Sequence, residues 1–369
     1  MQTQLARELG IDVPIFGFSH CRDVVAAVSR AGGMGVLGTS WITPEQLEIE
    51  LKWIDEHVGS KPYGVDVVFP GTYVDVRAGK DPYKILPKTH VEYINGLLDA
   101  DGVAPLPVSE ADAFRRQHAE QMNLTPEENE NFLAIALRHP IRLIVNALGV
   151  APKRAIDAVH GRGLKIGALV GSIKHAMKQK EAGVDLIVAQ GTEAGGHAGT
   201  ITSMVLWPQI VDAMRPIPVL AAGGIGRGSQ IAAALALGAE GAWCGSIWLG
   251  TIESDVSPDI KEKLYAAKSE DAVQTLAISG KPCRALRSKY TDAWERPAGL
   301  RPLKLPLQTI LGGEPTRRIE RAHAMEWLTY PVGQIVGEMR EQTSVRQVIQ
   351  DMLIEYAEAT ERLARLSMS

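Results

Sequence analysis

The feature of this sequence that most restricts its fold is a regular alternation of short apolar runs with amphipathic stretches. Eight apolar runs can be recognised, most of them spaced by about 20 to 40 residues, as expected of repeated βα units. The runs lie at residues 13–16, 34–37, 63–68, 143–146, 165–170, 186–189, 219–222 and 241–244. Parallel strands of this kind need helices on both faces of the sheet. The pattern therefore predicts an α/β protein with a closed (β/α)8 barrel, the TIM barrel.

The stretches between the runs have the character of helices. The predicted helices lie at residues 23–31, 44–57, 152–160, 173–182, 206–214 and 229–237. Several of them are followed by a glycine, such as Gly183 or Gly238, and glycine is common just past a helix C-terminus. The tail from 345 to 366 is amphipathic at helical spacing, so we expect it to close the barrel as its last helix.

Two stretches interrupt the eightfold rhythm. An insertion of about residues 70–124 follows the third strand, and it is longer than a βα connection requires. We expect it to cover the C-terminal rim of the barrel and to limit substrate size. A Pro-rich segment, 254–320, predicts a small satellite subdomain. The expected organisation is a barrel over 1–253, the satellite, and C-terminal helices over 321–369 that return to the barrel.

Composition argues against several classes of protein. The chain has 369 residues, of which 45% are hydrophobic and 22% charged, which is ordinary for a globular protein. Lys and Arg number 39 against 43 Asp and Glu, so a net charge of −4 offers no general attraction for nucleic acid or an anionic membrane. The N-terminus lacks the pattern of a secretory signal, and the three cysteines are widely spaced. We expect a cytoplasmic protein.

Glycine turns follow the seventh and eighth predicted strands. Gly223-Gly224 ends one strand and Gly245-Ser246 ends the next, which would let backbone N–H groups approach an anion closely. A helix beginning near Ser229 would add its positive N-terminal dipole. These features predict a phosphate site. A dinucleotide fingerprint is a poorer interpretation, because its third glycine would fall on Ser229 and the motif follows the seventh strand instead of the first.

The loop after the sixth strand contains the best candidate for catalysis. Residues 190–199 read Gln-Gly-Thr-Glu-Ala-Gly-Gly-His-Ala-Gly, in which one imidazole, that of His197, projects from a glycine-rich backbone. Histidine is the side chain best suited to exchange a proton near neutral pH. The alternative is a loop histidine that only binds a carbonyl group.

Together these motifs resemble the nitronate monooxygenase family, formerly called 2-nitropropane dioxygenases. The resemblance is carried by Gln-Gly-Thr-Glu-Ala-Gly-Gly-His at 190–197 and by the two glycine turns, and it extends over most of the chain. Further matching segments lie at 26–35, 280–287 and 330–334. The resemblance implies a flavin mononucleotide (FMN) at the C-terminal mouth of the barrel. It also implies oxidation of a carbon acid, by default an alkyl nitronate that combines with O2 to give a carbonyl compound and nitrite.

The resemblance assigns roles to individual residues. His197 matches the active-site histidine, which acts as a base or orients an anionic substrate. The expected cofactor-binding residues are Gly17, Asp66, Lys165, Gln190, Gly195, Gly196, Gly223, Gly224, Gly245, Ser246 and Gln334. The expected partners are a small carbon acid and O2, and a homodimer is possible.

Several alternatives stay open at this level. Asp66 stands where many relatives have Asn, and it is either part of the flavin site or a structural cap. Lys281, Arg284, Arg287 and Lys289 form either a solvated basic face or a site for an acyl carrier or CoA phosphate. The alternative enzyme is an NAD(P)H-dependent flavin reductase of the enoyl-acyl-carrier-protein reductase type. The third possibility is a flavin-binding protein without turnover.

Overall fold

A closed barrel of parallel strands forms the centre of the computed structural model, which describes residues 1–69, 82–122, 126–296 and 299–367. The eight strands pair in chain order, and β1 closes the barrel against β8. They are β1 (Ile15–Ser19), β2 (Met34–Gly38), β3 (Tyr63–Asp66), β4 (Leu143–Asn146), β5 (Lys165–Val170), β6 (Leu186–Gln190), β7 (Val219–Ala222) and β8 (Gly241–Cys244). The prediction of a (β/α)8 barrel is confirmed, and each strand overlaps one predicted run.

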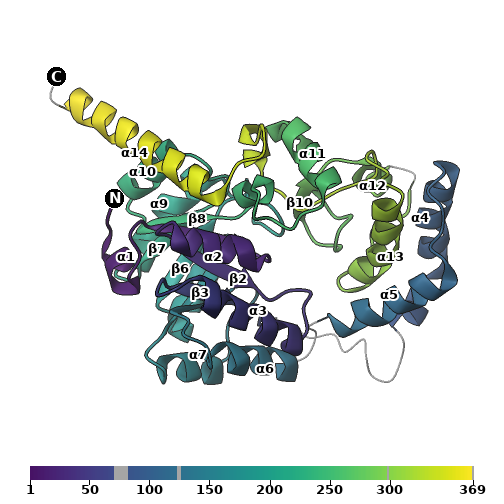
Figure 1. The fold of residues 1–369 in the computed structure, drawn as a ribbon, viewed down its shortest axis with the longest axis horizontal. Coiled ribbons are helices and arrows are strands. Elements are labelled where there is room, and N and C mark those ends of the chain that lie inside the picture. The colour runs from purple at the N-terminus through teal and green to yellow at the C-terminus, as the bar shows by residue number, and fades with distance from the viewer. Residues whose placement is uncertain (70–81, 123–125, 297–298, 368–369) are drawn as a thin grey trace.

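Helices surround the barrel, and each of them except α6 overlaps a helix predicted from the sequence (Figure 1). They are α2 (Arg22–Arg30), α3 (Pro44–His57), α6 (Pro126–Ala136), α7 (Lys153–His160), α8 (Ile173–Ala182), α9 (Ser203–Met214), α10 (Gly228–Ala236) and α14 (Val345–Ser367). Helix α14 packs on α10 and also contacts α2, so it stands between the last and the first helices of the barrel. Beyond these contacts its C-terminal end extends away from the barrel.

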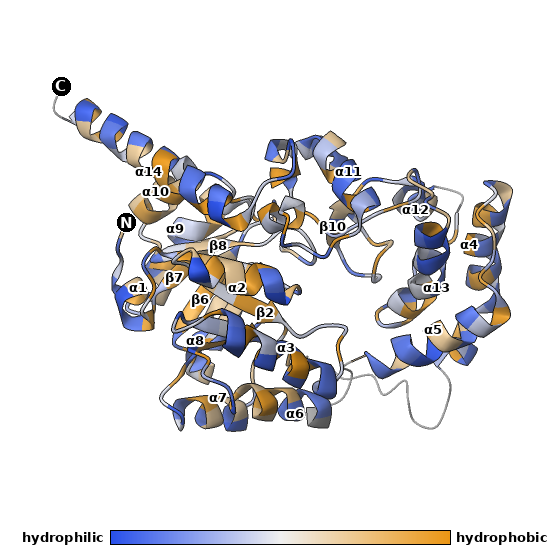
Figure 2. Cartoon of the chain, viewed as in Figure 1, coloured by the Kyte–Doolittle hydropathy of each residue, from blue (hydrophilic) through white to orange (hydrophobic). Residues whose placement is uncertain are grey.

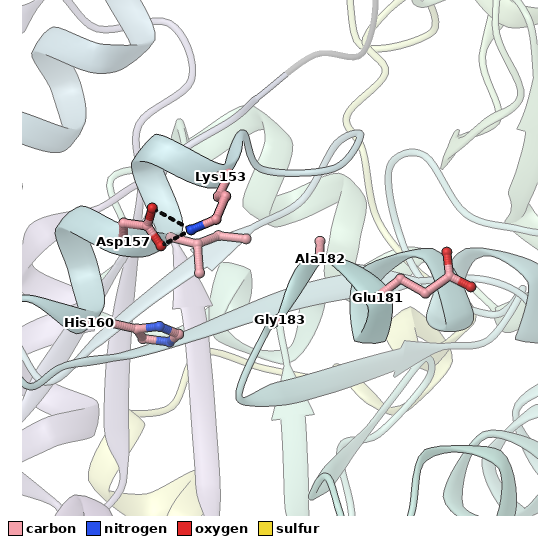
Figure 3. A pocket seen from close by; sticks show the side chains of 7 residues that line it. Lys153, Asp157, His160, Glu181, Ala182 and Gly183 are labelled. Atoms are coloured by element: carbon pink, nitrogen blue, oxygen red, sulfur yellow. Dashed lines mark hydrogen bonds and ion pairs between the residues drawn. The ribbon is translucent and has the colours of Figure 1, made fainter.

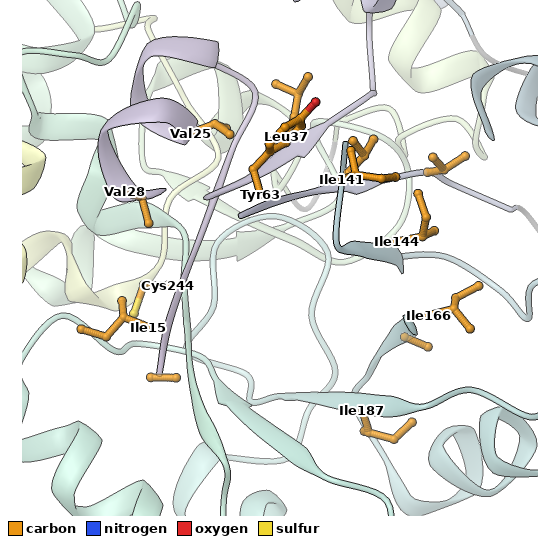
Figure 4. Packing of buried hydrophobic residues seen from close by; sticks show 14 of the residues in the cluster. Ile15, Val25, Val28, Leu37, Tyr63, Ile141, Ile144, Ile166, Ile187 and Cys244 are labelled. Carbon is orange, nitrogen blue, oxygen red and sulfur yellow. The ribbon is translucent and has the colours of Figure 1, made fainter. Parts of the chain in front are cut away.

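Two hydrophobic layers explain why the strands are apolar on both sides. Side chains between the strands and the helices, such as Ile15, Val28 and Ile187, form the larger cluster (Figure 4). The alternate side chains, such as Phe16 and Val188, fill the barrel interior. Figure 2 shows the consequence, because the barrel strands are mainly hydrophobic whereas the helices around them carry both hydrophobic and hydrophilic residues.

The N-terminal end of the barrel is closed by a short helix, α1 (Gln4–Leu9). Leu5 and Leu9 of this helix belong to the same cluster as the interior side chains. The site-bearing loops of a barrel enzyme lie at the opposite, C-terminal end of the strands. The N-terminal end of the barrel is therefore filled by α1, whereas the C-terminal end can hold an active site.

A second hydrophobic cluster lies beside the barrel, and we call it the second cluster. Its helical and strand elements are α4 (Lys88–Ala100), α11 (Pro258–Ala266), β9 (Ala272–Thr275), β10 (Cys283–Leu286), α12 (Lys289–Ala293) and α13 (Leu307–Arg321). The helix α5 (Val108–Glu120) and the short 3-10 helices η1 (Pro82–Ile85), η2 (Ser246–Gly250), η3 (Ser269–Asp271) and η4 (Gln334–Glu338) lie nearby. Helices α4 and α5 both pack on α13 (Figure 1). The insertion thus joins the satellite segment, and residues up to Met339 pack there too.

The insertion touches the barrel at the C-terminal end of β2. The ring of His118 on α5 stacks on Trp41, with 5.2 Å between ring centroids. Trp41 follows β2 and has a φ of 66°, an unusual value for a residue other than glycine. Residues 70–81 and 123–125 of the expected insertion lie outside the described part of the chain. The domain boundaries and the role of the insertion as a cover stay predictions.

Among the described residues, no helix combines the length and apolar character that a bilayer-spanning segment requires.

Candidate active site

The two glycine turns lie side by side at the C-terminal ends of β7 and β8, which are paired strands. Gly223 and Gly224 have φ values of 107° and 70°, which glycine adopts far more easily than other residues. Within the described residues, the N–H groups of Gly224 and Ser246 have no hydrogen-bond acceptor. A Cβ added at Gly245 would meet only Phe18, at 3.9 Å, so open space lies over this turn. Free donors beside open space fit an anionic group such as phosphate.

The prediction that the N-terminal dipole of the next helix, α10, contributes to this site is wrong. Helix α10 begins at Gly228, and the N–H of Gly228 donates to Glu355 of α14 at 2.9 Å. The N–H groups of Gly226 and Arg227 both donate to the side chain of Gln230. The first donors of this helix therefore already have acceptors inside the protein, and its dipole faces a carboxylate. Gly224 and Ser246 of the glycine turns therefore remain the candidate donors for this site.

The histidine loop is held in place by two segments from the second cluster. Gly196 pairs with Arg284 of β10 through two backbone hydrogen bonds of 3.0 and 2.7 Å. Gly195 lies so close to Gly333 that an added Cβ would stand 2.7 Å from the Gly333 nitrogen. The N–H of Gly333 in turn donates to Ser246 Oγ at 2.8 Å. The loop, the β8 turn and the segment before η4 therefore form one connected wall.

His197 projects from this wall next to Ser279. Its Nε2 lies 2.7 Å from Ser279 Oγ, and Ser279 is buried. The His197 side chain itself is exposed, and a Cβ added at the adjacent Gly196 would meet nothing within 4 Å. The imidazole is therefore fixed at one nitrogen and faces open space. This is the arrangement required of a base that must meet a substrate.

The pKa of His197 is lowered from its usual value. The main cause is desolvation by the surrounding protein, and the positive charge of Lys281 contributes as well. A lowered pKa keeps the imidazole neutral near pH 7, the form that accepts a proton. The same lysine makes the surroundings of His197 favourable for an anion.

Asp66 ends β3 and points into the barrel. The alternate residues Tyr63 and Val65 pack outward against the helices, so the side chain of Asp66 lies on the interior side. The residue is only 2% exposed, and its Oδ1 has no partner in the described structure. Desolvation raises the pKa of Asp66 to about 7, opposed by a hydrogen bond from the Ala147 backbone. A carboxyl that only capped a loop would be exposed to water, whereas the Asp66 carboxyl is buried and one of its oxygens has no partner among the described residues. A purely structural role therefore explains Asp66 poorly.

Of the other expected cofactor residues, Gln190 and Gln334 lie at this wall. Gln190 is the last residue of β6, beside Ala222 of β7. The N–H of Gln334 donates to the Glu193 carbonyl at 2.9 Å. Both positions are compatible with the expected site.

Two expected cofactor residues lie elsewhere. Lys165 is the first residue of β5, and its ammonium pairs with Glu8 of α1 at 2.9 Å, at the closed N-terminal end of the barrel. Gly17 faces the outer layer, because an added Cβ would stand 2.6 Å from Val28 of α2. We therefore correct both assignments: Lys165 serves the barrel bottom, and Gly17 allows a helix to pack closely.

Four residues at the site were not among the expected site residues. Ser279 and Lys281 come from the loop before β10, which is distant in sequence from His197. Glu193 accepts hydrogen bonds from the N–H and hydroxyl of Ser203, which fixes the loop to the start of α9. His20 follows β1 at the same end of the barrel, with its Nδ1 3.1 Å from the Gly38 carbonyl. Glu193 lies within the 190–197 motif and Lys281 within the matching segment 280–287, and His20 directly follows a predicted strand. Ser279 carried no signal in the sequence.

The supposed basic face also needs correction. Arg284 is 9% exposed, and its guanidinium donates to the backbone carbonyls of Thr192 and Ala272. It connects the histidine loop to the two-stranded sheet of β9 and β10 and is not part of a solvated patch. Lys289 is paired with Asp101 and Glu326, and Arg287 with Asp292. Of the four cations, Lys281 is the one that acts on His197.

A shallow cavity of about 420 Å³ lies between α7 and α8, on the outside of the barrel (Figure 3). Lys153 and Asp157 close one side of it through hydrogen bonds of 2.7 and 2.6 Å. None of the expected site residues lines this cavity. We therefore assign the chemistry to the mouth of the barrel.

A parallel barrel with free donors at its β7 and β8 turns and a histidine over open space defines an oxidoreductase of the flavin-binding barrel class. The chain belongs to the nitronate monooxygenase family, whose model, described as "Nitronate monooxygenase", matches residues 8–355. The resemblance found in the sequence is thereby confirmed.

Relatives in sequence agree with this assignment. The chain is 46% identical to a Mycobacterium tuberculosis protein named "Putative monooxygenase", over 99% of each chain. It is 28% identical to a "Probable nitronate monooxygenase" of Staphylococcus saprophyticus, over 79% of this chain and 80% of that protein.

Solved structures show the same architecture. A nitroalkane oxidase from Streptomyces ansochromogenes superposes with a TM-score of 0.77 and 25% identity, over 96% of this chain and 99% of the other. FabK from Thermotoga maritima superposes with a TM-score of 0.73 and 26% identity, over 99% of each chain. The protein is therefore a flavin-dependent oxidoreductase.

Proposed function

We propose that this protein is an FMN-dependent nitronate monooxygenase, which converts an alkyl nitronate and O2 into a carbonyl compound and nitrite. The observation that supports this most strongly is the placement of His197, which is held by Ser279, exposed to open space, and flanked by the cation Lys281. A nitronate is an anion formed from a carbon acid, and this set of residues suits both forms of such a substrate.

The cofactor would be held by the two glycine turns. The free N–H groups of Gly224 and Ser246 would bind its phosphate, and Gln190, Gly195, Gly196 and Gln334 would line the rest of the site. When bound, the flavin supplies the electron-transfer chemistry that amino-acid side chains lack. One phosphate site, with no separate nucleotide-binding unit, favours FMN over FAD.

Ser279 would determine which nitrogen of His197 accepts the proton. Ser279 Oγ lies 3.4 Å from the Lys281 carbonyl, to which it can donate. Its lone pair is then available to accept from His197 Nε2–H at 2.7 Å. In that tautomer the Nδ1 of His197 is unprotonated. We assign Nδ1 as the atom that takes the proton from a nitroalkane.

The first expected result concerns the cofactor and the reaction. The purified protein should be yellow, should release FMN on denaturation, and should consume O2 with an alkyl nitronate in the absence of NADH. Mass spectrometry of the released flavin and an oxygen electrode measure both properties. FAD in the extract would contradict the cofactor assignment.

The same preparation separates the alternative functions. Rapid anaerobic bleaching of the flavin by NADH, without oxygen uptake on nitronate, would indicate the flavin reductase. No response to either reductant would indicate a flavin-binding protein without turnover. A homodimer and a cytoplasmic location stay predictions.

A second expected result concerns Lys281. In Lys281→Met the pKa of His197 should rise, because the lysine charge that lowers it is gone. The rising limb of the pH profile on a neutral nitroalkane should therefore move to higher pH. The KM for the anionic nitronate should rise severalfold through lost attraction, with kcat less affected. Lys289→Met is the matched control, because Lys289 pairs with Asp101 and Glu326. Identical profiles for both variants would exclude this role.

A further inference from the structure

Asp66 presents an ionisable oxygen that the protein leaves without a partner at the mouth of the barrel. Its Oδ1 is fully buried and makes no hydrogen bond in the described structure, whereas buried polar atoms nearly always have one. The backbone around it is satisfied, since Thr39 donates to the Asp66 carbonyl through both its N–H and its hydroxyl. The unsatisfied atom is therefore confined to the carboxyl group, on the side that faces the barrel interior.

The surroundings of this carboxyl contain no charge among the described residues. Its register partners are Gly38 on β2 and Val145 on β4. The side-chain oxygen of Asn146 accepts from the N–H groups of Phe69 and Leu148, and its nitrogen donates to the Gly149 carbonyl. The titratable His20 lies on the carbonyl of Gly38, the register partner of Asp66, and desolvation lowers its pKa. Within the part of the chain that the structure describes, no cation acts on the Asp66 carboxyl to balance its ionised form.

We propose that Asp66 enters the cofactor site as a neutral carboxylic acid and donates a hydrogen bond to an acceptor atom of the flavin. This inference rests on the proposed flavin site. A carboxyl without a cationic partner is more stable protonated when buried, and its raised pKa agrees with this. A protonated carboxyl also has a donor to offer, and the electron-poor ring of a flavin has carbonyl and nitrogen acceptors. An ionised Asp66 would instead repel an anionic substrate in the same site.

The inference predicts a specific pH dependence of flavin binding. Binding that requires the protonated form weakens about tenfold for each pH unit above the pKa of the free protein. The dissociation constant of riboflavin should therefore be constant below about pH 6.5 and rise by roughly 100-fold by about pH 9. Riboflavin is the probe because it lacks the phosphate group, whose second ionisation near pH 6 would change the binding of FMN.

The experiment measures riboflavin fluorescence quenching by the full chain across this pH range. Asp66→Asn keeps a donor without a charge, so it should bind as tightly as the wild type at low pH and lose none of its affinity at high pH. Asp66→Leu has neither donor nor charge, so it should bind about tenfold more weakly than Asp66→Asn at every pH.

Parallel pH profiles for the wild type and Asp66→Asn would overturn the inference while leaving the flavin site intact. A complete lack of flavin binding by the wild type would instead contradict the proposed function itself. Should both variants fail to fold, the wild-type profile still decides, because constant affinity up to about pH 9 excludes a proton-dependent contact.

Discussion

His197→Asn is expected to keep its flavin and to lose about 10² to 10⁴ in rate on a neutral nitroalkane, or roughly 3 to 5.5 kcal/mol. The flavin is held by the glycine turns, so the visible spectrum should not change. Asparagine places an amide at the level of Nδ1, loses the contact that Nε2 makes with Ser279, and cannot accept the proton that His197 takes. A pre-formed nitronate has already lost this proton, so its turnover should fall much less. Stopped-flow kinetics with both substrates measure the difference.

The pH profile of the wild type gives a second check on His197. The turnover rate on the neutral substrate should increase as the pH rises through the pKa of one group, because the base acts only when deprotonated. Its pKa should lie below the usual imidazole range, as desolvation and Lys281 require. His57→Asn is the control, because His57 is exposed at the C-terminal end of α3, which precedes the start of β3 at the opposite end of the barrel. Equal losses on both substrates would mean that His197 orients the anion and does not act as a base.

Gly245→Val is expected to weaken FMN binding by at least roughly 100-fold, or about 2.7 kcal/mol. Gly245 has a φ of −120°, which valine accepts more readily than the positive φ of Gly224. An added side chain would enter the open space above the turn, where only Phe18 lies within 4 Å. The fold should therefore survive while the cofactor space is filled. Flavin content after gel filtration and the melting temperature measure these two properties.

A matched control for this variant is Gly96→Val on α4. An added Cβ at Gly96 also meets nothing within 4 Å, yet the residue lies in the second cluster, away from the turns of β7 and β8. It should keep a full complement of flavin. Unchanged FMN affinity in Gly245→Val would show that the phosphate lies elsewhere.

The barrel could be predicted from the sequence alone. Each strand is a short apolar run, and each surrounding helix has a local period and local end signals, such as the Thr43 cap and Pro44 that start α3. The glycine turns and His197 could also be found, because they directly follow predicted strands. Position along a strand is local information, and the C-terminal ends of parallel strands always meet at one end of a barrel.

Which of these groups is left without a partner, and can therefore bind a ligand or react, depends on contacts that form only in the folded protein. Lys165 was misplaced because the sequence gives no sign that a strand's first residue pairs with Glu8 at the closed end. The dipole of α10 was overestimated because its N-terminus meets Glu355, which is 127 residues away. Ser279 was missed for the same reason, and Lys281 was recognised only as part of a basic face. Hydrogen bonds, burial and pKa depend on neighbours that approach from distant parts of the chain, and local patterns carry no information about them.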